Sequence, residues 1–254
     1  MRDKLISIVT ANYNSQRFIF DTYSSIATQS YKNWEWLVTD DCSTDKSVEL
    51  LKKIALEDSR VKIYQNPRNY GAAKSRNNSI QKAKGDLIAF IDADDLWEPE
   101  KLKEQSKFMF EGGYGFSFTP HKLITEKGVF QGSVVDLFAP REIDYKSLLL
   151  KKATFGCSTV MLDRRIVGNI MMPNLRTGQD YATWLSILRE GSRAYLLRMP
   201  LTSYRIVEGS ISRNKFKKAL RHWQIYRDIE NLSLLYTTYC FLSYAFRFLF
   251  RTLL

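Results

Sequence analysis

The chain has 254 residues, of which 44% are hydrophobic and 26% charged, which supports a sizeable core and argues against wholesale disorder. Its 38 Lys and Arg residues against 27 Asp and Glu residues give a net charge of +11, which favours a polyanionic partner such as nucleic acid, an anionic membrane or a phosphorylated substrate. Three scattered cysteines without metal-ligand spacing and two distant histidines argue against a zinc site and for reduced thiols in the cytosol.

The first hundred residues alternate between strand-like and helix-like segments. Short runs rich in β-branched and apolar residues predict strands at 5–11, 33–41, 61–66 and 86–95. Apolar residues at helical spacing predict helices at 18–29, 43–58 and 69–85. This alternation indicates an α/β fold with a parallel sheet and helices on both faces. In such sheets, ligands bind at the carboxyl ends of the strands.

The second half of the chain is less regular. The Gly-rich segment 112–160 predicts antiparallel strands and loops, and 180–191 predicts a helix that ends at Gly191. Residues 193–206 predict one further strand. The composition changes after Ser210, where we expect the main domain to end.

The strand predicted at 86–95 ends in three carboxylates, Asp92, Asp94 and Asp95. Charges at the end of a buried strand are costly unless something neutralises them. Mg²⁺ and Mn²⁺ prefer carboxylate oxygens and leave positions open for phosphate oxygens. By itself the D-x-D pattern leaves two interpretations open: a metal–diphosphate site, or a cap for a helix that begins near Pro99.

Two further polar groups lie near strand ends and helix starts. Asp40 and Asp41 close an earlier predicted strand, where one carboxylate can accept a hydrogen bond from a base or sugar and the other can cap the next helix. Gly71, Lys74 and Arg76 come near a helix start, where amide groups and cations suit phosphate. For both groups, an ordinary capped helix with a solvated charged face is the alternative.

Four motifs, SIVTANYNS, VTDDCSTDKS, NYGAAKSRN and FIDADDLWEPEKL, occur in this order and at a spacing that resembles family 2 glycosyltransferases of the GT-A fold. The resemblance is strong over 4–105, and it is to bacterial enzymes that build capsule, O-antigen or other cell-surface glycans. It implies an α/β catalytic domain over 1–210 with a Rossmann-like, mixed but mainly parallel sheet flanked by helices. Within that domain, 1–100 would bind the nucleotide-sugar and 101–210 the acceptor. A helical, membrane-associating tail over 211–254 would follow.

The resemblance also implies the donor-binding residues. They are Thr10, Ala11, Asn12, Tyr13, Asp41, Gly71, Lys74, Arg76, Asp92, Ala93 and Asp94. Asp41 would accept the uracil N3–H of a UDP-sugar, and the segment from Gly71 to Arg76 would lie against the nucleotide and its phosphates. Asp94 would bind Mn²⁺ or Mg²⁺ directly, and Asp92 would contact the ribose or a metal-bound water.

The sequence GQDYATWL places Asp180 where the family carries the aspartate that deprotonates the acceptor hydroxyl. Gln179 replaces the acid that usually precedes it, and a simple helix cap is the alternative. Attack on the face opposite UDP would invert the anomeric carbon. The acceptor-side residues that the resemblance implies are Phe155, Gly156, Cys157, Gln179 and Trp184, the last as a surface on which a sugar could stack.

Many relatives carry a histidine after the segment that reads LTSYRI here, and it helps to bind metal or diphosphate. This chain has no histidine at that place. A third protein ligand to the metal is therefore not expected. Arg205, Ser210, Ser212 and Lys215 are the candidates for contacting the diphosphate instead.

The tail combines basic and apolar residues. Over 214–229 the apolar residues recur at helical spacing among lysines and arginines, which suits an anionic membrane surface. Residues 232–254 approach the ~20 residues of a membrane span, but Arg247 and Arg251 argue against burial in lipid. The apolar run at 5–11 is too short for a signal peptide. We therefore expect a cytoplasmic protein held peripherally at the inner membrane face; packing on the domain or a homodimer interface are alternatives for the tail.

The sequence thus predicts an inverting glycosyltransferase that moves a sugar from a nucleotide-sugar, favoured as UDP-linked, to a hydroxyl of a lipid-diphosphate-linked glycan. A nucleotidyltransferase would carry a Gly-rich basic loop after the first strand, where this chain reads TANYNSQRF. A nucleic-acid-binding protein would carry a basic and aromatic platform on the sheet, where this chain is acidic. An inactive glycan- or membrane-binding scaffold is the last alternative, and the presence of Asp94 and Asp180 argues against it.

Overall fold

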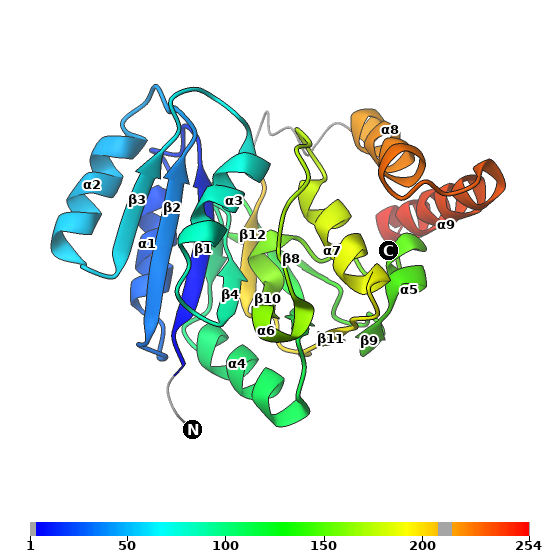
Figure 1. The fold of residues 1–254 in the computed structure, drawn as a ribbon, viewed down its shortest axis with the longest axis horizontal. Coiled ribbons are helices and arrows are strands. Elements are labelled where there is room, and N and C mark those ends of the chain that lie inside the picture. Colours follow the sequence, from blue (N-terminus) through cyan, green and yellow to red (C-terminus); the bar gives the residue numbers. More distant parts are fainter. Residues whose placement is uncertain (1–3, 208–214, 254) are drawn as a thin grey trace.

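A central sheet separates two layers of helices (Figure 1). The structure is a computed structural model that describes residues 4–207 and 215–253. The first hundred residues form β1 (Ile6–Asn12), α1 (Ile19–Ala27), β2 (Trp34–Asp40), α2 (Ser47–Glu57), β3 (Val61–Gln65), α3 (Ala72–Lys82) and β4 (Leu87–Phe90). β1 lies parallel to both β2 and β4, and β2 lies parallel to β3. The predicted alternation and the parallel sheet are confirmed.

The second half completes this sheet and adds a smaller one. Its elements are β5 (Leu96–Trp97), α4 (Lys101–Gly112), β6 (Phe116–Phe118), β7 (His121–Ile124), β8 (Phe130–Val135), β9 (Glu142–Ile143), α5 (Tyr145–Leu149), a 3-10 turn (Cys157–Thr159), β10 (Val160–Asp163), α6 (Arg164–Val167), α7 (Gln179–Arg189), β11 (Ala194–Leu196) and β12 (Thr202–Arg205). The large sheet runs β3-β2-β1-β4-β10-β6-β11-β9, and the small one runs β5-β12-β7-β8. Because β10 is antiparallel to both β4 and β6, the large sheet is mixed.

The single strand predicted at 193–206 is wrong. β11 pairs with β6 in the large sheet, whereas β12 pairs with β5 and β7 in the small sheet. Pro200 lies between them and has no backbone N–H to donate to a strand ladder. The chain therefore leaves one sheet and enters the other within a few residues.

The core fills both faces of the large sheet, because neighbouring residues of a strand point to opposite faces. Ile8 of β1 packs with the apolar residues of α1, α2 and α4, and its neighbour Val9 packs with those of α3, α5 and α7. Strands buried on both faces read as continuous apolar runs rather than alternating ones, as LISIV and LIAFI do here.

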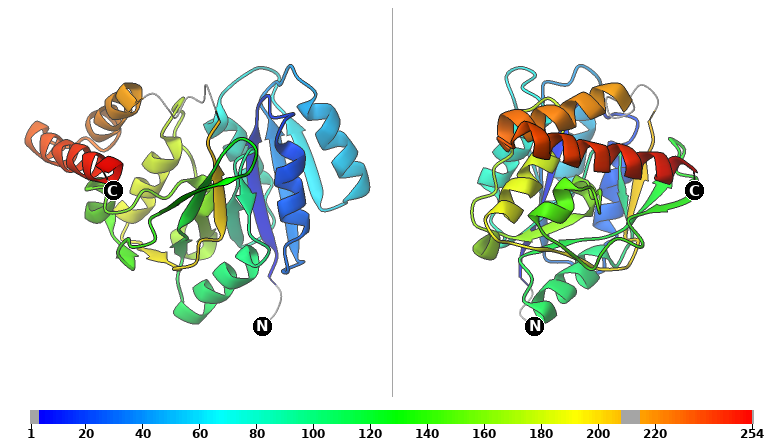
Figure 2. Two further views of the ribbon diagram at one scale, coloured as in Figure 1. Left: turned by 180° about the vertical axis from the view of Figure 1, so that it is seen from behind. Right: turned by 90° about the vertical axis from the view of Figure 1, so that its right-hand side faces the viewer.

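The tail continues the fold rather than standing apart from it. α8 (Lys215–Gln224) leads through a π-helical turn (Ile225–Ile229) into α9 (Leu234–Leu253), which lies across one end of the molecule (Figure 2). Ile225, Tyr226 and Cys240 are fully buried in the same core as α7. The boundary expected at residue 210 lies outside the described residues. Over residues 4–207 and 215–253, no helix combines the length and apolar character that a membrane crossing requires.

Candidate active site

Polar side chains brace the sheet edge where β1 and β2 end. The parallel register sets Asn12 opposite Asp40, and Asn12 Nδ2 donates to Asp40 Oδ1 at 2.6 Å. Thr10 is fully buried; its Oγ1 donates to the carbonyl of Ile91 at 2.8 Å and accepts from Trp36 Nε1 at 2.9 Å. The side chains of Thr10 and Asn12 therefore hold strands together.

The side chains of Thr10 and Asn12 are engaged within the protein, and the lining of a nucleotide pocket by this strand end stays a prediction. Both are fully buried, because a strand end that carries a functional loop needs its own polar groups satisfied within the protein. Ala11 is partly exposed and Tyr13 is 49% exposed. These two residues are the part of the first motif that a ligand can reach.

Asp41 organises the segment that leads into α3. It is only 2% exposed, and it accepts hydrogen bonds from Asn66 Nδ2 at 2.8 Å, Tyr70 N at 2.9 Å and Gly71 N at 2.7 Å. Gly71 has φ of +93°, a left-handed conformation that favours glycine. Both carboxylate oxygens of Asp41 are thus engaged within the chain, and its contact with uracil stays a prediction. Lys74 is exposed, with its Nζ 4.0 Å from the centre of the Tyr70 ring.

Arg76 is a buried cation between two acids. It is 6% exposed, and its Nη2 donates to Asp92 Oδ1 at 2.5 Å, so it pairs with the D-x-D motif. Its contact with the donor phosphates stays a prediction. Its Nε and Nη1 have no hydrogen-bond partner within the described part of the chain.

The electrostatics of Arg76 tie the D-x-D motif to the predicted base. Burial lowers the pKa of Arg76, but the charges of Cys157, Asp92 and Asp180 raise it more, so the pKa lies above its ordinary value. Burial also raises the pKa of the Cys157 thiol well above its usual range, which leaves that thiol neutral near pH 7. The counter-charges of Arg76 are therefore the carboxylates of Asp92 and Asp180, which lie in one small region although 88 residues separate them in sequence.

Asp95 fixes the turn after β4 instead of capping α4. It is 1% exposed; its Oδ2 accepts from Ser158 Oγ at 2.5 Å and its Oδ1 accepts from Arg205 N at 2.9 Å. Ser158 Oγ also accepts from Asp92 N at 3.0 Å. These bonds hold the acidic turn from the 3-10 turn on one side and from β12 on the other.

Arg205 supports the same turn from behind. It is 4% exposed; its Nε donates to the carbonyl of Asp94 at 2.7 Å and its Nη1 to the carbonyl of Glu126 at 2.5 Å. The candidate role of Arg205 in contacting the diphosphate is therefore wrong, because its guanidinium is buried in backbone contacts. Ser210 and Ser212 lie outside the described residues, as does the side chain of Lys215.

Asp94 has the properties of a cation ligand. Burial raises its pKa to about 6 and the nearby Asp92 charge adds to this, whereas Arg205 and Arg76 act in the opposite direction. A carboxylate held in this environment is stabilised by a divalent cation, and its oxygens are hard donors that suit Mn²⁺ or Mg²⁺. Within the described residues no three His, Cys, Asp or Glu side chains gather to hold an ion. A cation here would therefore depend on Asp94, Asp92 and oxygens from outside the chain.

Asp180 lies in the first turn of α7 and is partly exposed. Gly178 precedes the helix with φ of +72°, so the chain can turn sharply into α7 beside the tail. The Asp180 carboxylate accepts no hydrogen bond from the side chains and backbone groups of the described residues. A carboxylate that is reachable and not engaged can accept a proton from a bound hydroxyl.

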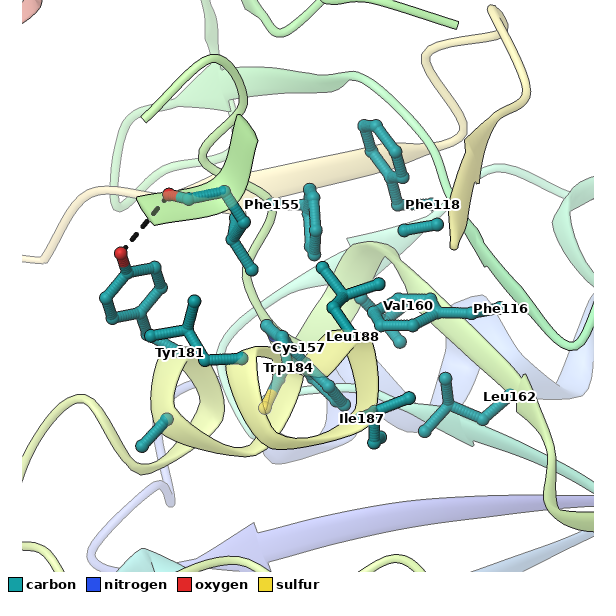
Figure 3. Close-up of a cluster of buried hydrophobic side chains, with 14 of the residues drawn as sticks. Phe116, Phe118, Phe155, Cys157, Val160, Leu162, Tyr181, Trp184, Ile187 and Leu188 are labelled. Carbon is teal, nitrogen blue, oxygen red and sulfur yellow. Dashed lines mark hydrogen bonds between the residues drawn. The ribbon is translucent and has the colours of Figure 1, made fainter. Parts of the chain in front are cut away.

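The acceptor-side predictions around α7 are largely overturned. Trp184 is fully buried, and its ring lies edge-on to Phe116 at 5.4 Å between centroids (Figure 3). It also lies edge-on to the ring of Phe90, at 5.5 Å between centroids. Phe155 and Cys157 belong to the same core. Trp184 follows Asp180 by one helical turn, but α7 runs down onto β4 and β6, so a sugar cannot stack on its ring.

Two acceptor-side residues remain near the surface layer. Gly156 is partly exposed, whereas Gln179 is 8% exposed and its Oε1 has no hydrogen-bond partner among the described residues. Gln179 replaces the family's acid next to Asp180. A contact of either residue with an acceptor stays a prediction.

Comparison with known proteins decides the family. Residues 7–170 match the sequence profile of Glycosyl transferase family 2. The chain belongs to this family. It is therefore a glycosyltransferase, and the prediction from the four motifs is confirmed.

The most similar relatives span almost the whole length of this glycosyltransferase. The putative teichuronic acid biosynthesis glycosyltransferase TuaG of Bacillus subtilis (strain 168) is 42% identical over 243 residues, which cover 95% of this chain and 94% of TuaG. WfgD of Escherichia coli, a UDP-Glc:alpha-D-GlcNAc-diphosphoundecaprenol beta-1,3-glucosyltransferase, is 36% identical over 233 residues, or 91% of this chain and 89% of WfgD.

Solved structures share the fold at low sequence identity. Staphylococcus aureus TarS 1-349 in complex with UDP-GlcNAc superposes with a TM-score of 0.71 at 20% identity, over 94% of this chain and 70% of TarS 1-349. The mannosyltransferase PcManGT from Pyrobaculum calidifontis, in complex with GDP-Man and Mn²⁺, superposes with a TM-score of 0.69 at 17% identity, over 90% of this chain and 64% of PcManGT. The GT-A fold expected from the motifs is confirmed, and the PcManGT structure with this fold contains Mn²⁺.

Proposed function

We propose that this glycosyltransferase moves a sugar from a UDP-sugar to a hydroxyl of a lipid-diphosphate-linked glycan, with inversion at the anomeric carbon, at the inner face of a bacterial membrane. The relatives support the substrate classes, because WfgD uses UDP-Glc and a diphosphoundecaprenol-linked GlcNAc, and TuaG is placed in teichuronic acid synthesis.

The donor would lie along the sheet edge. Ala11 and Tyr13 are reachable beside the end of β1, and the exposed Lys74 is the cation that phosphate can approach. Asp41 would accept a hydrogen bond from the uracil N3–H, in addition to those that it accepts from the backbone of the segment it fixes.

Asp94, with Asp92 through water, would hold Mn²⁺ or Mg²⁺ against the donor diphosphate. Such an ion would offset the negative charge that develops on the departing diphosphate. Arg76 orients Asp92 by its 2.5 Å hydrogen bond, and Arg205 fixes the carbonyl of Asp94. The chain itself thereby sets the geometry of the acidic turn.

Asp180 would act as the general base. An acceptor hydroxyl gives its proton to the Asp180 carboxylate as its oxygen forms a bond to the anomeric carbon. The bond from that carbon to the UDP oxygen breaks, and its electron pair leaves with UDP. Because attack and departure occur on opposite faces of the sugar, an α-linked donor yields a β-linked product.

The observation that carries this proposal is the 2.5 Å ion pair between the buried guanidinium of Arg76 and Asp92, at a cation whose pKa the charges of Asp92 and Asp180 raise. Asp92 belongs to the motif that would hold the diphosphate, and Asp180 begins the helix on the acceptor side. A base and a metal-binding acid in one small region are what a single transfer step requires, because the nucleophile and the leaving group share one carbon atom.

Titration calorimetry of UDP, GDP, dTDP and UMP, with and without Mn²⁺, tests the donor site. We expect UDP to bind most tightly, to need Mn²⁺, and to lose that dependence in Asp94→Ala. Glu57→Ala, which removes an exposed carboxylate at the end of α2, is the matched control and should bind UDP as the native protein does. Equal, metal-independent binding of all four nucleotides would overturn the proposed donor site.

A further inference from the structure

The outer face of α9 is apolar and open to solvent. Leu235, Tyr239, Leu242 and Phe246 are 86%, 54%, 62% and 61% exposed, and their spacing of four, three and four residues sets them along one side of the helix. We call these four residues the α9 stripe. The sequence of α9 contains no acidic residue. The stripe is therefore a continuous apolar strip without the negative charge that would repel an anionic surface.

The inner face of α9 is fixed to the domain. Thr237 and Cys240 are fully buried, and Ser243 Oγ donates to the carbonyl of Leu150 at 3.0 Å. These residues lie on a different side of the helix from the α9 stripe. Since the inner face is packed, α9 cannot roll to bury its stripe without losing core contacts, so water or a partner must cover the stripe.

A basic hollow adjoins the far end of the α9 stripe. It encloses about 420 Å³, and its lining includes Lys152, Arg247 and Phe138. One acid, Asp136, also lines it, but this side chain is only 8% exposed and accepts from Thr154 N. Arg247 directly follows the last residue of the stripe, Phe246, and Phe138 is 89% exposed in the loop between β8 and β9. Neither Lys152 nor Arg247 forms an ion pair with an acidic side chain of the described residues. Two cations and an exposed aromatic ring thus meet at one rim.

We propose that the α9 stripe and this hollow form a docking surface for a membrane that contains anionic lipids. The stripe and Phe138 would enter the boundary between headgroups and acyl chains, and a lipid phosphate would lie in the hollow between Lys152 and Arg247. The proposal deepens the proposed function, on which it rests only for the expectation that the acceptor is carried by a lipid.

Charge decides for a membrane over a second copy of the chain. A two-fold contact would set the same patch on both partners, so each Lys152–Arg247 hollow would face another surface of this basic chain. That contact would leave the cations unpaired or in repulsion, whereas anionic headgroups neutralise them. The chain's net charge of +11 adds to the attraction.

The docking surface is rigidly connected to the helix that carries Asp180. Tyr226, at the root of the tail, donates from its hydroxyl to the carbonyl of Leu149 at 2.8 Å and shares a 3.0 Å hydrogen bond with the hydroxyl of Tyr181. Tyr181 is the residue after Asp180. Docking of α9 would therefore orient the N-terminus of α7 relative to the membrane that carries the acceptor.

Vesicle flotation tests the surface, with vesicles of phosphatidylcholine alone and with phosphatidylglycerol added. The variants are Leu242→Glu/Phe246→Glu in the stripe and Lys152→Gln/Arg247→Gln in the hollow. The matched controls are Leu56→Glu and Lys52→Gln, which make the same kinds of change on α2 at the opposite end of the molecule (Figure 1). Thermal melting and UDP calorimetry establish that each variant is folded.

We expect the native chain and both controls to float with the anionic vesicles. The hollow variant should lose about thirtyfold in partition coefficient, from the removal of two charges near the surface. The stripe variant should lose about tenfold or more with either type of vesicle. Equal flotation of the native chain and the variants would overturn the proposal. A native dimer, detected by light scattering, would also overturn it if the stripe variant were monomeric and floated as the native chain does. UDP affinity that stays native in both variants separates failure of docking from failure of the proposed function.

Discussion

The strand-end cluster and α9 depart from ordinary burial in opposite directions. At the ends of β1, β2 and β4, charged and polar side chains are buried, among them Asp41, Arg76 and Asp95. On α9, large apolar side chains face solvent. Burial of charge costs free energy unless hydrogen bonds and counter-charges offset it, and exposure of a continuous apolar strip costs free energy unless something covers it.

The two regions offset these free-energy costs in different ways. The cluster finds most of it within the chain, because Arg76, Ser158 and Arg205 satisfy the acids. Its incomplete part is Asp94, whose raised pKa reflects an environment that a cation would relieve. The side chains of Leu235, Tyr239 and Leu242 in the α9 stripe are exposed to solvent instead. The first region therefore indicates a bound ion and substrate, and the second indicates a surface partner.

The largest effect should come from Asp180→Asn, which removes the base and keeps the shape of the side chain. We expect kcat to fall by about 10²–10⁴-fold while the affinity for UDP is retained. Single-turnover transfer and UDP calorimetry measure the two quantities. A native transfer rate in this variant would show that Asp180 only begins a helix and that the strand-end cluster does not include the base.

Trp184→Ala tests whether the acceptor side is core or ligand surface. Because Trp184 is fully buried between β4, β6 and α7, we expect the free energy of unfolding to drop by about 3–5 kcal/mol. The exposed aromatic Tyr13 provides the matched control, and Tyr13→Ala should cost far less stability. Denaturant unfolding checks both. A stable Trp184→Ala protein with a raised acceptor KM would restore sugar stacking on this ring.

Arg205→Gln tests whether the turn at Asp94 is held from behind. Loss of the 2.7 Å bond to the Asp94 carbonyl should weaken Mn²⁺-dependent UDP binding by about 10–100-fold, while metal-free binding changes little. Arg205→Lys should recover part of the affinity, since it keeps a cation at the site. Equal losses with and without Mn²⁺ would instead indicate a general structural role for Arg205.

The smallest expected effect concerns Lys101, whose side chain specifically tests the cost of burying a charge. It is fully buried, its Nζ donates to Gln105 Oε1 at 2.5 Å, and burial lowers its pKa to about 7. The unfolded chain, with a lysine pKa near 10.5, binds more protons than the folded chain between these values. Stability from this residue should therefore rise with pH, by up to about 1 kcal/mol per pH unit above pH 7.

The matched variant for that test is Lys101→Met, which keeps an unbranched side chain without a charge. We expect it to be more stable than the native protein at pH 7 and below, and to lose the extra rise toward pH 10. Denaturant unfolding at several pH values measures the difference between the two proteins. Parallel pH profiles would mean that Lys101 is neutralised or solvated in a way that its burial does not indicate.

The sequence determined the elements that depend on local pattern. The strands and helices of the first hundred residues follow from runs and spacings of apolar residues, and four ordered motifs identify the family. The acids at the strand ends were also visible, because parallel strands deliver their carboxyl ends to one edge. Asp94 and Asp180 were therefore accessible as candidates before any tertiary contact was known.

Only the tertiary structure decided which side chains are buried and what they hold. Trp184 has helical spacing that fits a ligand face or a core, and its packing against Phe90 and Phe116 settles this. Arg205 lies 111 residues from Asp94, and Ser158 lies 63 residues from Asp95, so no local signal links these pairs. The packing of the tail likewise places Tyr226 in the core and leaves the α9 stripe exposed. Local pattern fixes what a segment can be, whereas contacts between distant segments fix which of its groups remain for a ligand.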